Sequence, residues 1–132
     1  MCYVLSVKFM YTRNSILMDK SKAFALRIIK MYRYLCEEKK EFVLSKQVLR
    51  SGTSIGANIR EGFHGQSDAD FIAKLSIAQK ETSETMYWLE LLHESGYMED
   101  EPFDSIYADC EELMKLLTFS LKKKKAALTP NT

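Results

Sequence analysis

The chain contains few residues that interrupt helices. Only two prolines and five glycines occur in its 132 residues. Proline removes a backbone donor, and an interior glycine costs a helix about 1 kcal/mol relative to alanine. A chain poor in both therefore favours long helices over many short strands. At this length, one domain with a hydrophobic core is expected rather than two.

Cysteines and long apolar runs are scarce as well. Cys2, Cys36 and Cys110 are odd in number and lack the spacing of a metal site, which predicts reduced thiols and a cytoplasmic location. No stretch approaches the roughly 20 apolar residues of a membrane span, so no membrane partner is expected. The apolar N-terminal stretch lacks a charged start and is interrupted by Lys8, which argues against a signal peptide.

The chain also has little net charge. Its formal charge is +1, which gives no overall attraction to nucleic acid or membrane. The distribution is uneven, however. Residues 1–66 carry 12 Lys/Arg and 5 Asp/Glu, whereas residues 67–132 carry 7 and 13. This split is most simply explained by complementarity within one subunit or between subunits. The alternative interpretation is a functional basic face.

Apolar residues recur at three- and four-residue spacing in four segments, as on one face of a helix. These segments are about 21–38, about 45–62, about 67–95, and a fourth that begins near Pro102 and runs through the lysines at 122–125. Short connections between them favour antiparallel neighbours. The predicted fold class is all-α, an antiparallel up-down-up-down four-helix bundle.

Two of these segments have unusual compositions. The segment at 21–38 is apolar over more than half its circumference and so needs more than one burying surface, which indicates oligomerisation. The segment at 45–62 contains Gly52 and Gly56 among other small residues. This pattern favours close approach of two helices. The alternative is a loop between two shorter helices, because each glycine weakens a helix.

The expected bundle spans residues 19–128. Residues 1–18 are expected to form an N-terminal extension outside the native domain, because Met10 and Met18 are alternative start sites to Met1. Residues 129–132 are expected to be a disordered tail.

Glu61-x-x-His64 and Glu90-x-x-His93 match the tetrads of di-iron bundles. A turn near residue 65 would separate them by roughly 30 Å along the bundle, whereas metal ligands converge within about 2 Å of one ion. No metal site is therefore predicted. Neither histidine is spaced to activate a nucleophile, and no phosphate-binding loop is present. We therefore expect no enzyme activity, catalytic residue, cofactor or small-molecule substrate.

Polar side chains form a stripe along the second predicted helix. They are Arg50, Ser54, Asn58 and Glu61, at the spacing of one helical face. In an antiparallel hairpin, Arg50 would lie beside Glu81 or Glu84. This arrangement predicts a buried polar network that fixes the register or a subunit interface. The alternative is a solvated polar face.

Two long motifs carry a family resemblance. Residues 47–62 read QVLRSGTSIGANIREG, and residues 70–89 read DFIAKLSIAQKETSETMYWL. Together they resemble the bacterial four helix bundle protein family, also called the 23S rRNA intervening-sequence proteins, over about residues 19–120. No enzymatic activity defines that family. Its relatives include the accessory variability protein of diversity-generating retroelements, a pentameric barrel that binds nucleic acid through basic surface. The resemblance implies a ring-shaped homopentamer.

The leading functional interpretation is a non-catalytic, self-assembling scaffold, an accessory in a ribonucleoprotein or retroelement setting. The alternative is a protein that binds RNA or DNA directly through exposed cations. The candidate residues are Arg27, Lys30, Arg33, Lys46, Arg60, Lys122, Lys123, Lys124 and Lys125. The four consecutive lysines also have a simpler explanation, because cations at a helix C-terminus complement the helix dipole.

Overall fold

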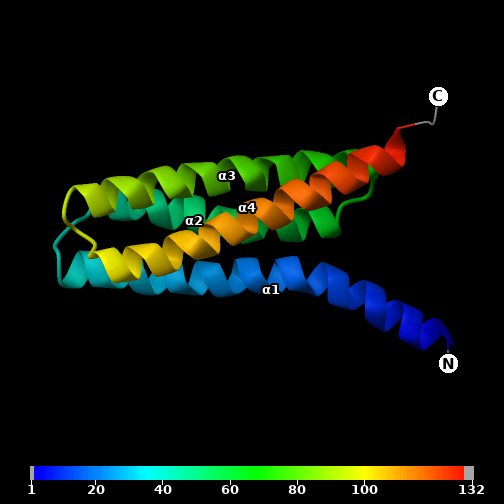
Figure 1. Cartoon of the computed structure of the whole chain (residues 1–132), viewed down its shortest axis with the longest axis horizontal. Helices are drawn as coiled ribbons and strands as arrows, with labels where there is room; N and C mark the ends of the chain where they lie inside the picture. Colours follow the sequence, from blue (N-terminus) through cyan, green and yellow to red (C-terminus); the bar gives the residue numbers. More distant parts are fainter. Residues whose placement is uncertain (1, 130–132) are drawn as a thin grey trace.

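A computed structural model describes residues 2–129 of the chain, with side chains described from Ile16 onward. It contains four helices, α1 (Cys2–Glu37), α2 (Leu44–Phe63), α3 (Asp68–Glu94) and α4 (Asp100–Leu128). Successive helices run in opposite directions along one long axis (Figure 1). The described part of the chain contains no strand. The predicted all-α four-helix bundle is confirmed.

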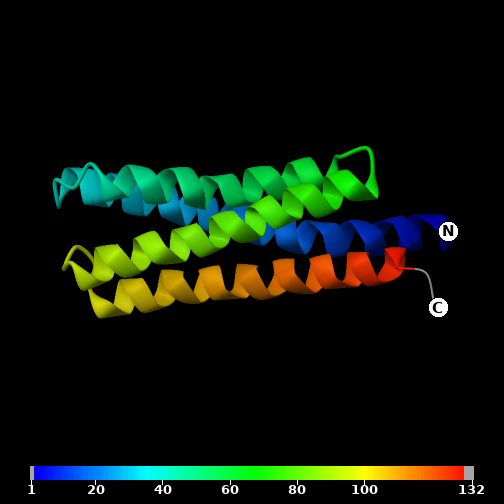
Figure 2. The same cartoon turned by 90° about the horizontal axis from the view of Figure 1, so that it is seen from above.

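Each helix contacts two neighbours around a common core. α2 packs against α1 and α3, and α4 packs against α3 and α1, which closes the ring (Figure 2). The seam between α1 and α4 has the fewest contacts of the four. One cluster of apolar side chains fills the interior. Its fully buried members include Ile28, Leu35, Ile55, Ile59, Leu75, Leu89 and Leu117.

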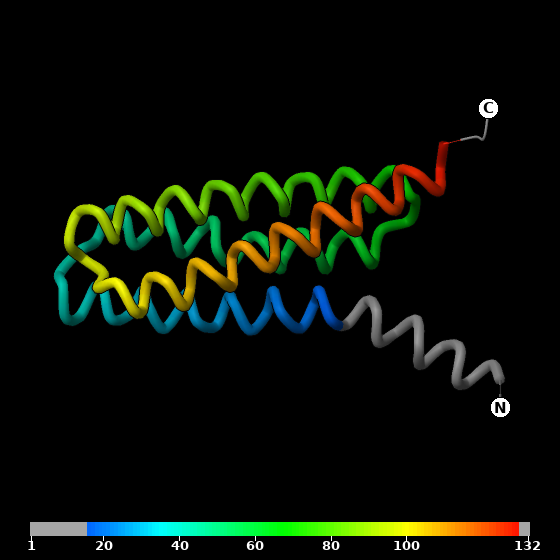
Figure 3. Tube along the Cα trace, viewed as in Figure 1, coloured from blue at the N-terminus to red at the C-terminus, as the bar shows by residue number. Residues whose placement is uncertain are grey.

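The connections lie at two ends of the bundle. Residues 38–43 and 95–99 form turns at one end, which we call the two-turn end, and residues 64–67 form the turn at the other end (Figure 3). The C-terminus of α4 lies at the same end as residues 64–67 (Figure 1). This arrangement determines which charged residues can share a surface.

The glycines of α2 lie where α1 and α2 approach closely. A Cβ built on Gly52 would lie 2.9 Å from Cγ1 of Ile28, and one on Gly56 would lie 3.3 Å from Oγ of Ser21. α2 is continuous through both positions. The alternative of a loop between two short helices is therefore wrong. Close packing against α1 compensates for the low helix propensity of glycine.

Local sequence signals define the ends of α3. The Ser67 hydroxyl accepts a hydrogen bond from the Asp70 backbone N–H at 3.1 Å and so caps the N-terminus of α3. The Asp70 carboxylate in turn accepts from the Gln66 backbone N–H at 3.3 Å. After α3, Gly96 adopts a φ of 90°, a left-handed conformation that glycine reaches without strain.

Two predicted boundaries differ from the structure. Leu17 is only 4% exposed and Met18 packs against the same core, so both belong to the bundle rather than to an extension ending at residue 18. The side chains of residues 1–15 and the tail residues 130–132 lie outside the described part. α4 begins at Asp100, before Pro102, because proline is tolerated in a first helical turn.

Across the described residues, none of the four helices carries an apolar stretch long enough to cross a bilayer.

Candidate functional site

The seam between α2 and α3 carries a charged cluster at its surface. The Arg50 guanidinium lies 3.4 Å from Oε2 of Glu81 and forms a second ion pair with Glu84. The Trp88 indole N–H donates to the same Glu84 carboxylate at 3.2 Å. Arg50 thus meets the partners that the hairpin register predicted.

Electrostatics within this cluster favour the charged forms. The hydrogen bond from Arg50 is the main reason why the pKa of Glu84 lies below its usual value, even though partial burial opposes the shift. The same bond raises the pKa of Arg50. The Arg50 side chain is nevertheless 50% exposed, so water screens the pair. The cluster is a surface feature, not the buried network expected from the sequence.

The remaining polar residues of the stripe do not join this cluster. The Ser54 hydroxyl donates to the Arg50 carbonyl at 2.6 Å, and the Asn58 amide donates to the Ser54 carbonyl at 2.8 Å. Glu61 pairs instead with Lys74 at 2.9 Å. The expected single network is therefore three separate sets of local contacts along α2.

A buried hydroxyl pair was missed by the sequence analysis. The Thr85 hydroxyl lies 2.8 Å from the Ser51 hydroxyl and also bonds to the Glu81 carbonyl at 2.8 Å. Both residues are fully buried between α2 and α3. The signal was the position of Ser51, three residues after the core residue Val48, which places a polar group on the apolar face. This pair, rather than Arg50, is the buried polar contact of the seam.

A buried carboxylate organises the turn before α2. Oε1 of Glu41 accepts from the backbone N–H groups of Val43 at 3.0 Å and Leu44 at 2.8 Å, and Oε2 accepts from that of Ser45 at 2.6 Å. Burial alone would raise the pKa of Glu41, but these bonds outweigh burial and lower it. Glu41 thus supplies the cap that the N-terminus of α2 otherwise lacks.

Some candidate nucleic-acid-binding residues are engaged within the chain. Arg27 forms an ion pair with Asp109 and donates to the Ser105 hydroxyl at 3.0 Å. Lys124 pairs with Asp68 at 2.9 Å and lies 5.1 Å from the centre of the Phe71 ring. These cations are therefore partly neutralised before any partner binds.

The other candidates are exposed but dispersed. Within the described residues, Arg33, Lys46 and Arg60 form no ion pair. Lys46 lies at the two-turn end, whereas Arg60 and the lysines at 122–125 lie toward the opposite end (Figure 1). The candidate cations therefore do not converge on one basic surface.

Acidic residues are concentrated in the halves of α3 and α4 nearer the two-turn end. Residues 81–114 contain eleven Asp/Glu and no Lys/Arg, and they form the second part of α3, its turn and the first half of α4. Basic residues of α1 and α2 pair with this segment, as Lys20 does with Glu112 at 2.6 Å. Glu94, Glu99, Glu101, Asp104 and Glu111 form no ion pair among the described residues. Complementarity between the two halves is therefore only partly satisfied within one chain.

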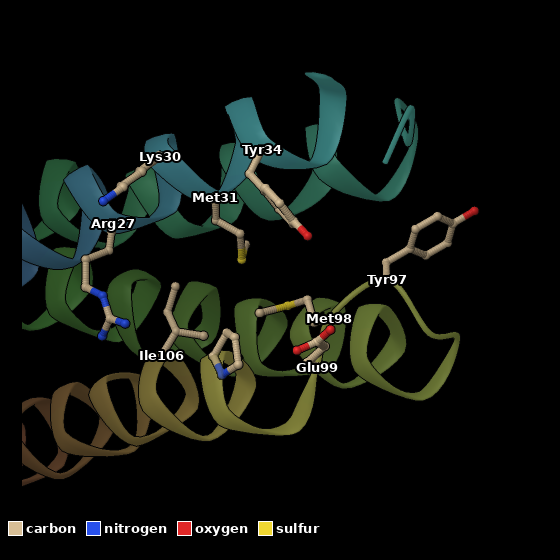
Figure 4. Close-up of a pocket in the computed structure, with 9 residues that line it drawn as sticks. Arg27, Lys30, Met31, Tyr34, Tyr97, Met98, Glu99 and Ile106 are labelled. Atoms are coloured by element: carbon tan, nitrogen blue, oxygen red, sulfur yellow. The ribbon is translucent and has the colours of Figure 1, made fainter. Parts of the chain in front are cut away.

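A cleft of about 560 Å³ opens between α1 and α4 near the two-turn end. Met31, Met98 and Ile106 point into the gap between the helices, and Tyr34 extends over it from α1 (Figure 4). Arg27, Lys30, Tyr97, Glu99 and Pro102 complete the lining. The cleft is mostly apolar and lies in the seam with the fewest contacts.

The two Glu-x-x-His tetrads lie at opposite ends of the bundle, since one is near the end of α2 and the other near the end of α3 (Figure 1). His93 stacks on Phe103 with ring centres 4.1 Å apart and bonds to Asp100 at 2.7 Å. Across the described residues, no three His, Cys, Asp or Glu side chains cluster as metal ligands would.

The sequence matches the family described as 23S rRNA-intervening sequence protein over residues 13–119. The chain belongs to this family. It is also similar to the crystal structure of a protein with unknown function from the S23 ribosomal protein family of Bacteroides thetaiotaomicron. The two are 55% identical with a TM-score of 0.82, over 83% of this chain and 98% of that one. No curated protein matches the chain. Neither the family nor this structural relative indicates a catalytic activity.

Proposed function

We propose that this 23S rRNA-intervening sequence family member is a non-catalytic, self-assembling scaffold that acts in the cytoplasm. Its role would be that of an accessory in a ribonucleoprotein or retroelement setting. The single observation that carries this proposal is the unsatisfied charge division of the bundle. Acidic residues 81–114 and the cations of α1 and α2 both retain members without a partner in the described chain.

Exposed apolar side chains support the same proposal. Leu26 on α1 is 60% exposed, and Tyr34 and Tyr87 are also exposed. Single exposed apolar residues are ordinary on a protein surface. Here they accompany an open apolar cleft and two oppositely charged halves, which together suit a neighbouring copy. A closed ring, five copies in the assembly that the family resemblance implies, would satisfy both halves of every chain.

The alternative is direct binding of RNA or DNA. One observation favours it, because Arg33, Lys46 and Arg60 are exposed and form no ion pair within the described residues. The dispersal of the basic candidates between both ends of the bundle argues against a single nucleic-acid groove.

The two functions are separated by measuring assembly and RNA affinity in the same samples. Sedimentation equilibrium should give a mass of several chains without RNA. Titration with fluorescent single-stranded RNA and duplex DNA at 50 mM salt should show no binding for a pure scaffold. Direct nucleic-acid binding would be established if the logarithm of the affinity fell steeply and linearly with the logarithm of the salt concentration. The slope of that line is set by the number of phosphates that the protein contacts.

A further inference from the structure

Two adjacent apolar side chains project from the turn at residues 38–43. Phe42 is 52% exposed and Val43 is 72% exposed. A polar turn is the ordinary way to connect two helices, so two adjacent exposed apolar side chains are unusual at this position. We call this pair the apolar knob.

Hydrogen bonds fix the backbone of the turn on both sides of the apolar knob. The buried Glu41 carboxylate, only 7% exposed, binds three successive backbone N–H groups from Val43 onward. The Glu41 backbone N–H donates to the Leu35 carbonyl at 3.0 Å, which ties the turn to the end of α1. A knob fixed before binding loses little conformational entropy when it docks.

We propose that the apolar knob of one copy docks into the cleft between α1 and α4 of a second copy. This inference rests on the proposed self-assembly and identifies its contact. The cleft offers an apolar floor of Met31, Met98 and Ile106. Its volume of about 560 Å³ accommodates a phenylalanine and a valine side chain together. Methionine floors adapt their shape to an inserted side chain, which suits this occupant.

Charge complementarity supports the second copy as the occupant. Lys39 and Lys40 precede the knob. Glu99 lines the cleft just before α4, and Glu101 follows it in the first turn of that helix. All four are exposed, and none forms an ion pair within the described chain. Docking would bring these lysines beside these carboxylates, which have no lysine or arginine nearby in sequence.

The contact is also compatible with a closed assembly of identical chains. The knob and the cleft are different surfaces of the same chain, so each copy can give its knob to the next and receive one from the previous copy. Such a heterologous contact generates a ring when its rotation closes. The proposal therefore needs no second kind of subunit.

The first test is the particle mass of Phe42→Ser/Val43→Ser, measured by sedimentation over a range of protein concentrations. We expect association to weaken by roughly tenfold to a hundredfold, the range for removing a central anchor. Phe119→Ser is the matched control, because it removes an exposed phenylalanine near the other end of the bundle and should leave the mass unchanged. Unchanged thermal unfolding of the isolated chains shows that neither change acts through the fold.

The second test is a charge exchange. Two double substitutions should each weaken assembly, Lys39→Glu/Lys40→Glu beside the knob and Glu99→Lys/Glu101→Lys at the start of α4. The four changes combined should restore assembly. Restoration cannot come from better folding, because Glu101, which stabilises the first turn of α4 together with Asp100, remains absent. The knob contact is wrong if the unmodified chain assembles and the knob variant assembles equally well. It is also wrong if Phe119→Ser weakens assembly as much as the knob substitutions do. In both cases self-assembly itself still stands. A single-chain mass for the unmodified protein overturns both.

Discussion

Replacing Glu41 should destabilise the bundle far more than a turn residue ordinarily would. Glu41→Ala leaves three backbone N–H groups at the start of α2 without their acceptor. Loss of a helix cap costs about 0.5–2 kcal/mol, and hydrogen bonds to a charged group contribute about 1.5–3 kcal/mol each. Water can reach the exposed Val43 end of the turn, so we expect a total loss of about 2–3 kcal/mol.

The assay is thermal and urea unfolding followed by circular dichroism at one fixed protein concentration. For a chain of this size, a loss of this magnitude lowers the melting temperature by roughly 6–15 °C. Glu38→Ala is the matched control, since Glu38 is exposed and should change the free energy of unfolding by less than about 0.5 kcal/mol. Equal effects of the two substitutions would refute the assignment of Glu41 as the cap of α2.

The pH dependence gives a second check on the same residue. The folded state lowers the pKa of Glu41, so its stabilising contribution is complete above the ordinary glutamate pKa of about 4.3. The contribution is lost as the pH falls through the lowered folded-state pKa. The difference in unfolding free energy between the unmodified chain and Glu41→Gln should therefore be constant near neutral pH and shrink below about pH 4. A difference that grows on acidification would contradict this sign.

Two further predictions concern the seams of α2. Gly52→Ala should destabilise the bundle by about 1 kcal/mol, because the new Cβ meets Ile28 at 2.9 Å, whereas Gly56→Ala should be nearly neutral; urea unfolding of both variants would distinguish them. A more stable Gly52→Ala would show that relieving the contact with Ile28 costs less than the roughly 1 kcal/mol that alanine gains in helix propensity. In a double-mutant cycle, Arg50→Ala and Glu84→Ala should couple by about 0.5–1 kcal/mol and lose coupling at high salt. Strict additivity would mean that the half-exposed pair contributes nothing.

The helices could be predicted because their signals are local. The three- and four-residue spacing of apolar positions gave four helices, and the hairpin register placed Arg50 opposite Glu81 and Glu84. The glycines of α2 also predicted a close approach of two helices, and the structure shows that the neighbour is α1. Each of these features depends on periodicity or on the length of one connection.

The features that were missed depend on contacts between segments. Whether Ser54 reaches another helix or bonds to its own backbone cannot be decided from spacing, and it bonds to the Arg50 carbonyl. Glu41 was overlooked because its carboxylate caps a helix that starts three residues later, through a turn with Lys40 at a φ of 53°. The cleft between α1 and α4 arises from sparse packing along one seam, which no single segment encodes.

The central claim, that charged halves and exposed apolar groups are completed by neighbouring copies, is tested most directly by counting chains in the native particle. Native mass spectrometry of the purified chain at micromolar concentration, from a buffer of low ionic strength, gives that number. Self-assembly predicts a particle mass of two or more whole chains. The ring implied by the family resemblance would contain five. A mass of one chain at every concentration would contradict it.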